Sequence, residues 1–336
     1  MRAFGLWLLW GSPAIAGTLY TVDPSSDTLL ELDTTRLRTR VVGPIGVDFD
    51  FGSLAWDAAN QRMFLSPGRA VDMLFTVDVA SGSLTRVGAH GIGDLFGMAY
   101  DPVADVLWGG SGPGTNLYQI DPNSGRSRQV GQLQQRISGA EWDPFFGGMV
   151  YNNLATTEFY LVRPPDTTAY LLGNAGVYMN DGGIAYDADT ELYFSVDYNG
   201  TIQSFDPKRG FELVSTTAGP MALDGLASTQ RFDWRGPRLV NSSGTCPGQM
   251  TFDLTDVTPN ADYAVVRGDP GSMELRNGVC RGSFVQLSGA SLVTRRTAAA
   301  NGTGIFQGNV PGAACGSTIQ VLDLSACRAS NLVHLQ

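Results

Sequence analysis

Short runs of apolar residues that end in a polar turn recur along most of the chain. The clearest run extends from Phe96 to Pro102, where mostly apolar positions lead into an acidic residue and a proline. Aligned copies share one anchor position, which is occupied by Ala55, Ala99, Glu141, Ala185 and Ala227. These anchors lie 44, 42, 44 and 42 residues apart. A repeat of about 40–50 residues built from short strands is typical of one blade of a β-propeller.

Two further registers keep the same period. An aromatic residue marks the second strand of each repeat, at Tyr20, Phe64, Trp108, Tyr151 and Tyr193. A further residue, usually Asp, opens the turn after the third strand, at Asp33, Asp78, Asp121, Arg163 and Asp206. In turns such as Asp121–Gly125, Asp accepts hydrogen bonds from the turn amides, Pro presets φ and Gly takes the left-handed position. Because three registers agree over the same span, we predict repeats of four strands.

The two ends of the repeat complete each other. Residues 19–43 supply the second, third and fourth strands of a repeat without its first strand, and residues 225–228 supply a first strand with nothing after it. Joining the two closes a ring through one shared sheet and leaves no open sheet edge. We therefore predict a five-bladed β-propeller over residues 17–230.

From residue 231 onward the strands alternate differently. Gly, Pro and Asn turns separate short candidate strands, among them Met250–Leu254, Tyr263–Val266, Ser291–Val293, Gly304–Gln307 and Ile319–Leu324. About seven short strands in roughly 100 residues are typical of an Ig-like or fibronectin-like β-sandwich. We predict such a domain over residues 231–336, so the fold class is all-β.

The hairpins Asp78–Gly82 and Asp121–Gly125 follow the pattern Asp-x-x-Ser-Gly. In this the repeat resembles secreted propellers of the quinoprotein-like and YVTN/NHL-like kind. The resemblance covers about two thirds of the chain and implies the fold, whereas propellers host unrelated activities. Related quinone-dependent dehydrogenases use a vicinal disulfide, and because the repeat region has no Cys we expect no quinone cofactor. The C-terminal part is similar to sandwich modules appended to secreted bacterial proteins.

Charge and the first residues indicate where the protein acts. With 32 acidic and 22 basic residues the net charge is −10, which disfavours nucleic acid as a partner because phosphate binding needs clustered Lys and Arg. Met1–Arg2, the apolar run Ala3–Trp10 and the small-x-small motif Ala14–Ala16 predict a signal peptide over residues 1–16. The apolar run is too short to span a bilayer. We expect a secreted, extracellular monomer, with the periplasm or cell surface as alternatives.

All four cysteines lie after residue 230, at Cys246, Cys280, Cys315 and Cys327. An even number in an exported module implies two disulfides. Three pairings exist, and we favour Cys246–Cys280 with Cys315–Cys327 because the second bond closes a short local loop. A zinc site is disfavoured because no Cys-x-x-Cys spacing occurs.

Carboxylates gather just before the expected innermost strands, at Asp48, Asp50, Asp94, Asp181 and Asp224. Glu141 replaces Ala at the anchor position, and we expect its carboxylate to point into the central channel. These connections meet at one mouth of a propeller, and Ca²⁺ takes carboxylate oxygens in flexible geometry. We predict that Ca²⁺ is held by Asp50, Asp94, Glu141, Asp181 and Asp224. The alternative is that each acid caps its own strand or faces water.

Other candidate chemistry indicates binding rather than catalysis. The chain has two histidines, His90 and His334, in different regions, which disfavours a multi-His metal centre and a Ser-His-Asp triad. We expect a non-catalytic binding or surface-display protein whose propeller engages a glycan or an extracellular protein. The alternative is a glycosidase-like hydrolase that pairs Glu141 with Asp94 or Asp181.

Aromatic residues share the position after the anchor, at Trp56, Tyr100, Trp142 and Tyr186. Packing between blades explains them better than a platform for stacking sugars. We therefore expect them to be structural.

Overall fold

The computed structural model describes residues 18–69, 71–179, 182–219, 221–230 and 236–336. The predicted signal peptide and Asp181 lie outside these residues. The described chain consists of β-strands and two short 3-10 turns, and no helix in it is long and apolar enough to cross a membrane.

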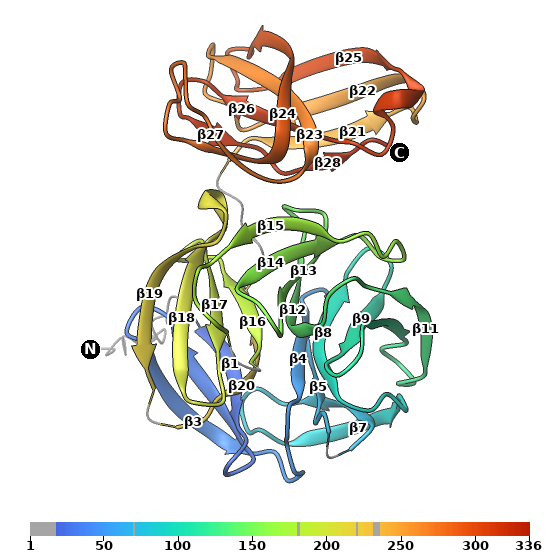
Figure 1. Cartoon of the computed structure of the whole chain (residues 1–336), viewed down its shortest axis with the longest axis vertical. Helices are drawn as coiled ribbons and strands as arrows, with labels where there is room; N and C mark the ends of the chain where they lie inside the picture. Colours follow the sequence, from blue (N-terminus) through green and yellow to red (C-terminus); the bar gives the residue numbers. More distant parts are fainter. Residues whose placement is uncertain (1–17, 70, 180–181, 220, 231–235) are drawn as a thin grey trace, which may run out of the picture.

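Five four-stranded antiparallel sheets follow one another through the described part of residues 18–228, here called the repeat region (Figure 1). Sheet 1 has the order β20 (Asp224–Ser228), β1 (Thr18–Asp23), β2 (Thr28–Asp33), β3 (Arg38–Pro44). Sheet 2 comprises β4 (Ser53–Asp57), β5 (Arg62–Ser66), β6 (Met73–Val77) and β7 (Leu84–Ala89). Sheet 3 comprises β8 (Leu95–Asp101), β9 (Val106–Ser111), β10 (Asn116–Ile120) and β11 (Ser127–Gln132). Sheet 4 comprises β12 (Ile137–Asp143), β13 (Gly148–Asn153), β14 (Glu158–Val162) and β15 (Tyr170–Asn174). Sheet 5 comprises β16 (Ile184–Asp187), β17 (Leu192–Val196), β18 (Thr201–Asp206) and β19 (Glu212–Ala218), with η1 (Pro207–Arg209) before β19.

The sequence registers fall on equivalent strands of these sheets. The five anchors lie on β4, β8, β12, β16 and β20, and the five second-strand aromatics lie on β1, β5, β9, β13 and β17. Each anchor-bearing strand packs against the next one, and β20 packs against β4, so these innermost strands form a closed ring. This is the arrangement of a β-propeller.

The ring closes where the two ends of the repeat region meet. β20 pairs antiparallel with β1, with Leu226 opposite Thr21 and Ser228 opposite Leu19. The Thr21 hydroxyl also donates to the backbone carbonyl of Asp224 at 3.1 Å. Residues from both ends of the region therefore build one sheet, as the pattern predicted.

Small residues near the start of the innermost strands allow the backbones to approach. A Cβ on Gly139 would lie 2.5 Å from the backbone nitrogen of Ile184, and one on Gly183 would lie 2.1 Å from that of Leu226. Equivalent positions of neighbouring repeats therefore lie side by side around the ring, and a larger side chain has no room there.

The described residues from 236 onward, here called the C-terminal region, form two antiparallel sheets. Sheet 6 has the order β21 (Arg238–Ser243), β22 (Gly248–Thr255), β25 (Gly304–Val310). Sheet 7 has the order β24 (Phe284–Thr297), β23 (Asp262–Glu274), β26 (Thr318–Asp323), β27 (Arg328–Ala329), and β28 (Val333–His334) also pairs with β26. The turn η2 (Gly312–Ala314) precedes β26. Met250 and Phe252 of sheet 6 share one buried core with Val265 and Val321 of sheet 7, so the sheets pack face to face.

The C-terminal region also shares a core with sheets 4 and 5. Val285 and Leu287 of β24, together with Leu332, are buried in one cluster with Phe145 and Phe211 of the repeat region. The backbone N–H of Leu332 donates to the carbonyl of Phe145 at 2.8 Å. The two regions are therefore joined by buried apolar contacts as well as by the chain.

The expected disulfide pairing is wrong. The structure links Cys246 to Cys315 and Cys280 to Cys327. The loop after β23 lies over one face of sheet 7, where Cys280 is buried with Ala264 and Leu322, and its Sγ is 3.6 Å from the carbonyl oxygen of Leu324 in the turn that carries Cys327. The last residues of the chain accept backbone hydrogen bonds from both Cys246 and Gly316, which brings Cys246 to Cys315. Contacts between segments far apart in the sequence thus decide the bonds, and the short loop that favoured Cys315–Cys327 does not.

Candidate functional site

The ends of four innermost strands, β4, β8, β12 and β20, line a pocket of about 340 Å³, here called the aromatic pocket. Trp56 near the end of β4, Tyr100 near the end of β8 and Trp142 near the end of β12 line it. Glu141 contributes a carboxyl group and Gln230 an amide. Aromatic walls with a few polar groups are typical of sites for small ligands.

Buried aspartates hold the turns that follow these aromatic residues. Asp57, Asp101 and Asp143 come directly after Trp56, Tyr100 and Trp142. In each case one carboxylate oxygen accepts the backbone N–H groups two and three residues further on, at 2.7–3.2 Å. This is the Asx-turn arrangement. The acid of the repeat therefore shapes the rim of the pocket.

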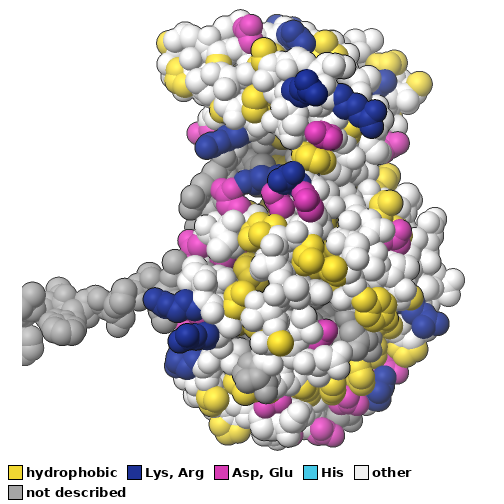
Figure 2. All heavy atoms as spheres, turned by 60° about the vertical axis from the view of Figure 1, so that its left-hand side comes forward, with side chains coloured by type: hydrophobic (Ala, Val, Ile, Leu, Met, Phe, Trp, Pro, Cys, Tyr) yellow, Lys and Arg dark blue, Asp and Glu magenta, His cyan; other side chains and the backbone are white. Residues whose placement is uncertain are grey.

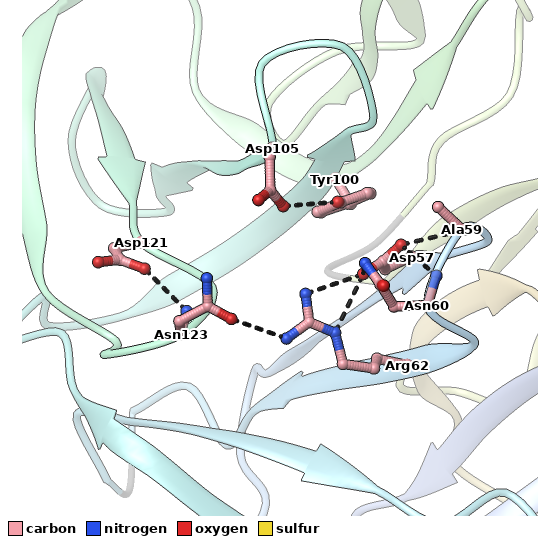
Figure 3. A network of polar contacts seen from close by, with 8 residues as sticks. All are labelled: Asp57, Ala59, Asn60, Arg62, Tyr100, Asp105, Asp121 and Asn123. Atoms are coloured by element: carbon pink, nitrogen blue, oxygen red, sulfur yellow. Dashed lines mark hydrogen bonds and ion pairs between the residues drawn. The ribbon is translucent and has the colours of Figure 1, made fainter.

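A polar network ties one of these turns to the neighbouring sheet (Figure 3). Arg62 on β5 donates to Oδ2 of Asp57 from Nε at 3.0 Å and from Nη2 at 2.9 Å, and its Nη1 reaches Oδ1 of Asn123 at 3.0 Å. Burial alone would raise the pKa of Asp57, but hydrogen bonds from Asn60 and Arg62 hold that pKa below its usual value. Asp57 is therefore a charged, fixed acceptor at neutral pH.

The ring of Tyr100 is held in place by its own hydroxyl. That group donates to Oδ1 of Asp105 at 2.8 Å (Figure 3). Burial raises the pKa of Tyr100, and the hydrogen bond to Asp105 raises it further. One wall of the aromatic pocket is therefore oriented before any ligand arrives.

Glu141 and Asp143 have different surroundings although they lie two residues apart on β12. Burial raises the pKa of Asp143 to about 6, against hydrogen bonds from Tyr193, Phe146 and Phe145. Burial raises the pKa of Glu141 well above its usual value, and the nearby Asp143 raises it further. Within the described part of the chain, the Glu141 carboxyl makes no hydrogen bond. It is thus the polar group that the pocket offers to a ligand.

Two of the carboxylates predicted to bind Ca²⁺ meet through an arginine. Asp50 and Asp94 precede β4 and β8, and Arg69 lies 3.7 Å from Oδ2 of Asp50 and 2.8 Å from Oδ1 of Asp94. The same guanidinium lies over the ring of Phe51, 4.4 Å from its centroid. The ring of Tyr198 stacks on that of Phe51, with centroids 4.7 Å apart, and its hydroxyl donates to Oδ1 of Asp50 at 2.9 Å. Arg69 therefore supplies the positive charge between Asp50 and Asp94 that the sequence pattern assigned to Ca²⁺.

The remaining predicted ligands are placed elsewhere. Asp224 is buried on β20 and accepts the N–H groups of Gly52 and Gly225 at 3.1 and 2.7 Å. Asp48 is exposed, and Asp181 lies outside the described residues. Among the residues that the structure describes, no three His, Cys, Asp or Glu side chains form a group able to hold a metal ion. The calcium site stays a prediction.

Glu141 lies away from Asp94. The residue of β8 equivalent to Glu141 is Ala99, five positions after Asp94, or roughly 15 Å along an extended strand. A glycosidase pair needs its carboxyl groups about 5–9.5 Å apart. The described lining of the aromatic pocket contains a single carboxyl group, that of Glu141. The structure therefore does not bring Glu141 and Asp94 together as an acid pair.

The sequence pattern missed two parts of this picture. Trp56, Tyr100 and Trp142 pack against apolar clusters between the sheets, as expected, but the pattern did not predict that they also line a pocket, whereas Tyr186 at the same repeat position is buried in an apolar core. Arg69 lies outside all three registers, so nothing in the repeat marks it.

A larger cavity of about 630 Å³ lies between the repeat region and the C-terminal region. Figure 2 shows acidic and basic side chains next to each other at this waist. Lys208 is paired with Glu191, and Arg209 with Glu212. These charges already compensate each other, which favours a structural role for this cavity.

No protein-family model and no curated protein matches the sequence. Solved structures with a similar arrangement include one titled as a nidogen/laminin complex, at 11% identity over 95% of this chain and 94% of that chain, with a TM-score of 0.47. A protein of unknown function from Bacteroides thetaiotaomicron is 13% identical over 64% of this chain and 66% of its own, with a TM-score of 0.42. TolB from Acinetobacter baumannii is 11% identical over 63% of this chain and 66% of its own, with a TM-score of 0.43. Likenesses this distant carry no argument about function.

Proposed function

We propose that this protein is an exported, non-catalytic binding protein that holds a sugar residue of a glycan in the aromatic pocket. The observation that carries the proposal is that Trp56, Tyr100 and Trp142, from three different repeats, line one cavity together with the Glu141 carboxyl. The apolar faces of a sugar ring pack against aromatic side chains, and its hydroxyls need a few polar partners. Glu141 supplies such a partner, whereas the Gln230 amide already bonds to Ala188 and Asp189.

The charge of the pocket supports a neutral ligand. Because its pKa is raised, the Glu141 carboxyl is less often ionised than an exposed glutamate. A partly protonated carboxyl both donates and accepts hydrogen bonds, as a sugar hydroxyl does. A cationic ligand would favour an ionised carboxylate instead.

We infer the finer architecture from the same features. The five sheets of the repeat region correspond to five blades of a propeller domain over residues 17–230. The two sheets that share a core support an Ig-like or fibronectin-like sandwich over residues 231–336. Two disulfides and the predicted signal peptide support export to the outside of the cell.

A glycan array followed by calorimetry with the best oligosaccharide tests the proposal. We expect Trp142→Ala to weaken binding by about three- to tenfold, because one stacking wall is lost. Tyr178→Ala is the matched control, since Tyr178 is 53% exposed and lies outside the pocket. Binding of no glycan, or equal losses in the two variants, would overturn the proposal.

A further inference from the structure

The two sheets of the C-terminal region are open along one side. β24 is the edge of sheet 7 and β25 is the edge of sheet 6, and in the described residues the two strands do not pair with each other. A cleft of about 200 Å³, here called the edge cleft, lies between them. It is smaller than the roughly 300–1,000 Å³ pockets that hold drug-sized ligands.

The floor of the edge cleft is apolar. Phe252 and Phe306 line it and stack on each other, with ring centroids 4.9 Å apart. Val265 and Ile319 line it from sheet 7 and are almost fully buried. Val293 also lines it, yet 56% of its surface is exposed. An apolar side chain that lines the cleft is thus left partly uncovered at its edge.

Two arginines line the same cleft. Arg296 on β24 is opposite Tyr263, and Arg267 on β23 is opposite Ile319. Directly opposite residues of antiparallel strands point to the same face of a sheet. Tyr263 and Ile319 belong to the core between the two sheets. The side chains of Arg267 and Arg296 therefore leave the backbone on the core-facing side of sheet 7. In the part of the chain that the structure describes, neither takes part in an ion pair.

We propose that the edge cleft binds a medium-chain carboxylate. The alkyl chain lies in the cleft against Phe252 and Phe306 and covers the side chain of Val293, whose apolar surface water now contacts. The carboxylate meets Arg267 and Arg296, because a guanidinium matches a carboxylate in both charge and geometry. This site is separate from the aromatic pocket, which lies in the repeat region.

Calorimetry on the full chain with octanoate tests the proposal, with octyltrimethylammonium as a probe that has the same tail and the opposite charge. We expect octanoate to bind, the cation to give no heat, and added salt to weaken octanoate binding. Equal heats from both probes, or no heat from octanoate, would overturn the proposal.

Neighbouring arginines on β24 provide the matched variants. We expect Arg296→Gln to weaken octanoate binding by about tenfold and Arg295→Gln to leave it unchanged. Arg295 is opposite Ala264, which belongs to a core on the other face of sheet 7. Both side chains are exposed, so both variants should keep the thermal stability of the parent chain. The same affinity in both variants would contradict the assignment.

Discussion

The hydroxyl of Tyr193 donates a 2.6 Å hydrogen bond to Oδ2 of Asp143, 50 residues away in the sequence. Tyr193 lies on β17 of sheet 5 and Asp143 ends β12 of sheet 4, and both are buried. The acid that shapes the turn after one innermost strand is thereby anchored to the next sheet. The bond therefore supports both the ring and the rim of the aromatic pocket.

We expect Tyr193→Phe to lower the free energy of unfolding by about 1–3 kcal/mol, because Asp143 stays buried and loses the hydroxyl that donates a hydrogen bond to it. Urea denaturation measures the change. Tyr178→Phe is the control: its hydroxyl donates to the carbonyl of Leu154 at 2.9 Å, but the side chain is exposed and water replaces the bond. Equal effects in the two variants would show that the buried Tyr193 hydrogen bond contributes no more to the free energy of unfolding than the exposed Tyr178 bond.

Closure of the ring predicts a second sensitive position. Leu226 on β20 is 1% exposed and packs with Leu19 of β1 and Phe194 of β17. We expect Leu226→Ala to destabilise the protein by about 2–4 kcal/mol, measured as a shift in the urea midpoint. Val214 on β19 is 55% exposed, so Val214→Ala should change stability by less than about 0.5 kcal/mol. A small effect at Leu226 would mean that β20 does not hold the ring together.

The sheets were predictable because their signals are local and repeated. Each copy places Ala or Glu at the anchor, an aromatic such as Phe64 on the second strand, and a turn such as Asp121–Gly125 after the third strand. Because the pattern occurs five times, it stays recognisable although single copies depart from it, as Arg163 does in place of Asp. Even the pairing of the two ends of the repeat region follows from counting strands.

The candidate site was less predictable because it depends on distances that a repeat does not encode. The pattern correctly singled out Glu141 as an exception to the anchor, but it grouped Glu141 with Asp94 because both lie near innermost strands. The structure separates them along the strand direction. Arg69, which joins Asp50 to Asp94, has no equivalent in the repeat and left no signal.

The corrected disulfide pairing is testable without any variant. Proteolysis of the unreduced protein followed by mass spectrometry should recover peptides that join Cys246 to Cys315 and Cys280 to Cys327. Replacing Cys246 and Cys315 together by Ser should lower stability by about 2–4 kcal/mol, because the bond closes a long loop in the unfolded chain. A peptide joining Cys246 to Cys280 would instead restore the pairing that the sequence suggested.

His90 predicts how stability depends on pH. The side chain is 4% exposed, its Nδ1 accepts the backbone N–H of Ile92 at 3.1 Å, and its Nε2 lies 3.1 Å from the Ser66 hydroxyl. Burial lowers the pKa of His90, against Asp72 and the backbone of Met73, which raise it. As the pH falls, the unfolded chain, with a histidine pKa of about 6.5, therefore takes up the proton at a higher pH than the folded chain does. The contribution of His90 is present above about pH 6.5 and is lost as the pH falls through the lower folded pKa.

Between about pH 6.5 and pH 5 we expect the wild-type protein to lose stability relative to His90→Asn, because only the wild type carries the His90 contribution. Urea denaturation at several pH values gives the two slopes. Carboxylates whose pKa is lowered, such as Asp57, act below about pH 4. Asp143 and Glu141, whose pKa values are raised, contribute in the opposite sense to His90 as the pH falls, but both are present in the two proteins and cancel in the comparison. His334, whose pKa burial also lowers, is present in both proteins and cancels in the comparison. Identical slopes would mean that His90 takes up its proton equally well in the folded and unfolded chains, contrary to its burial.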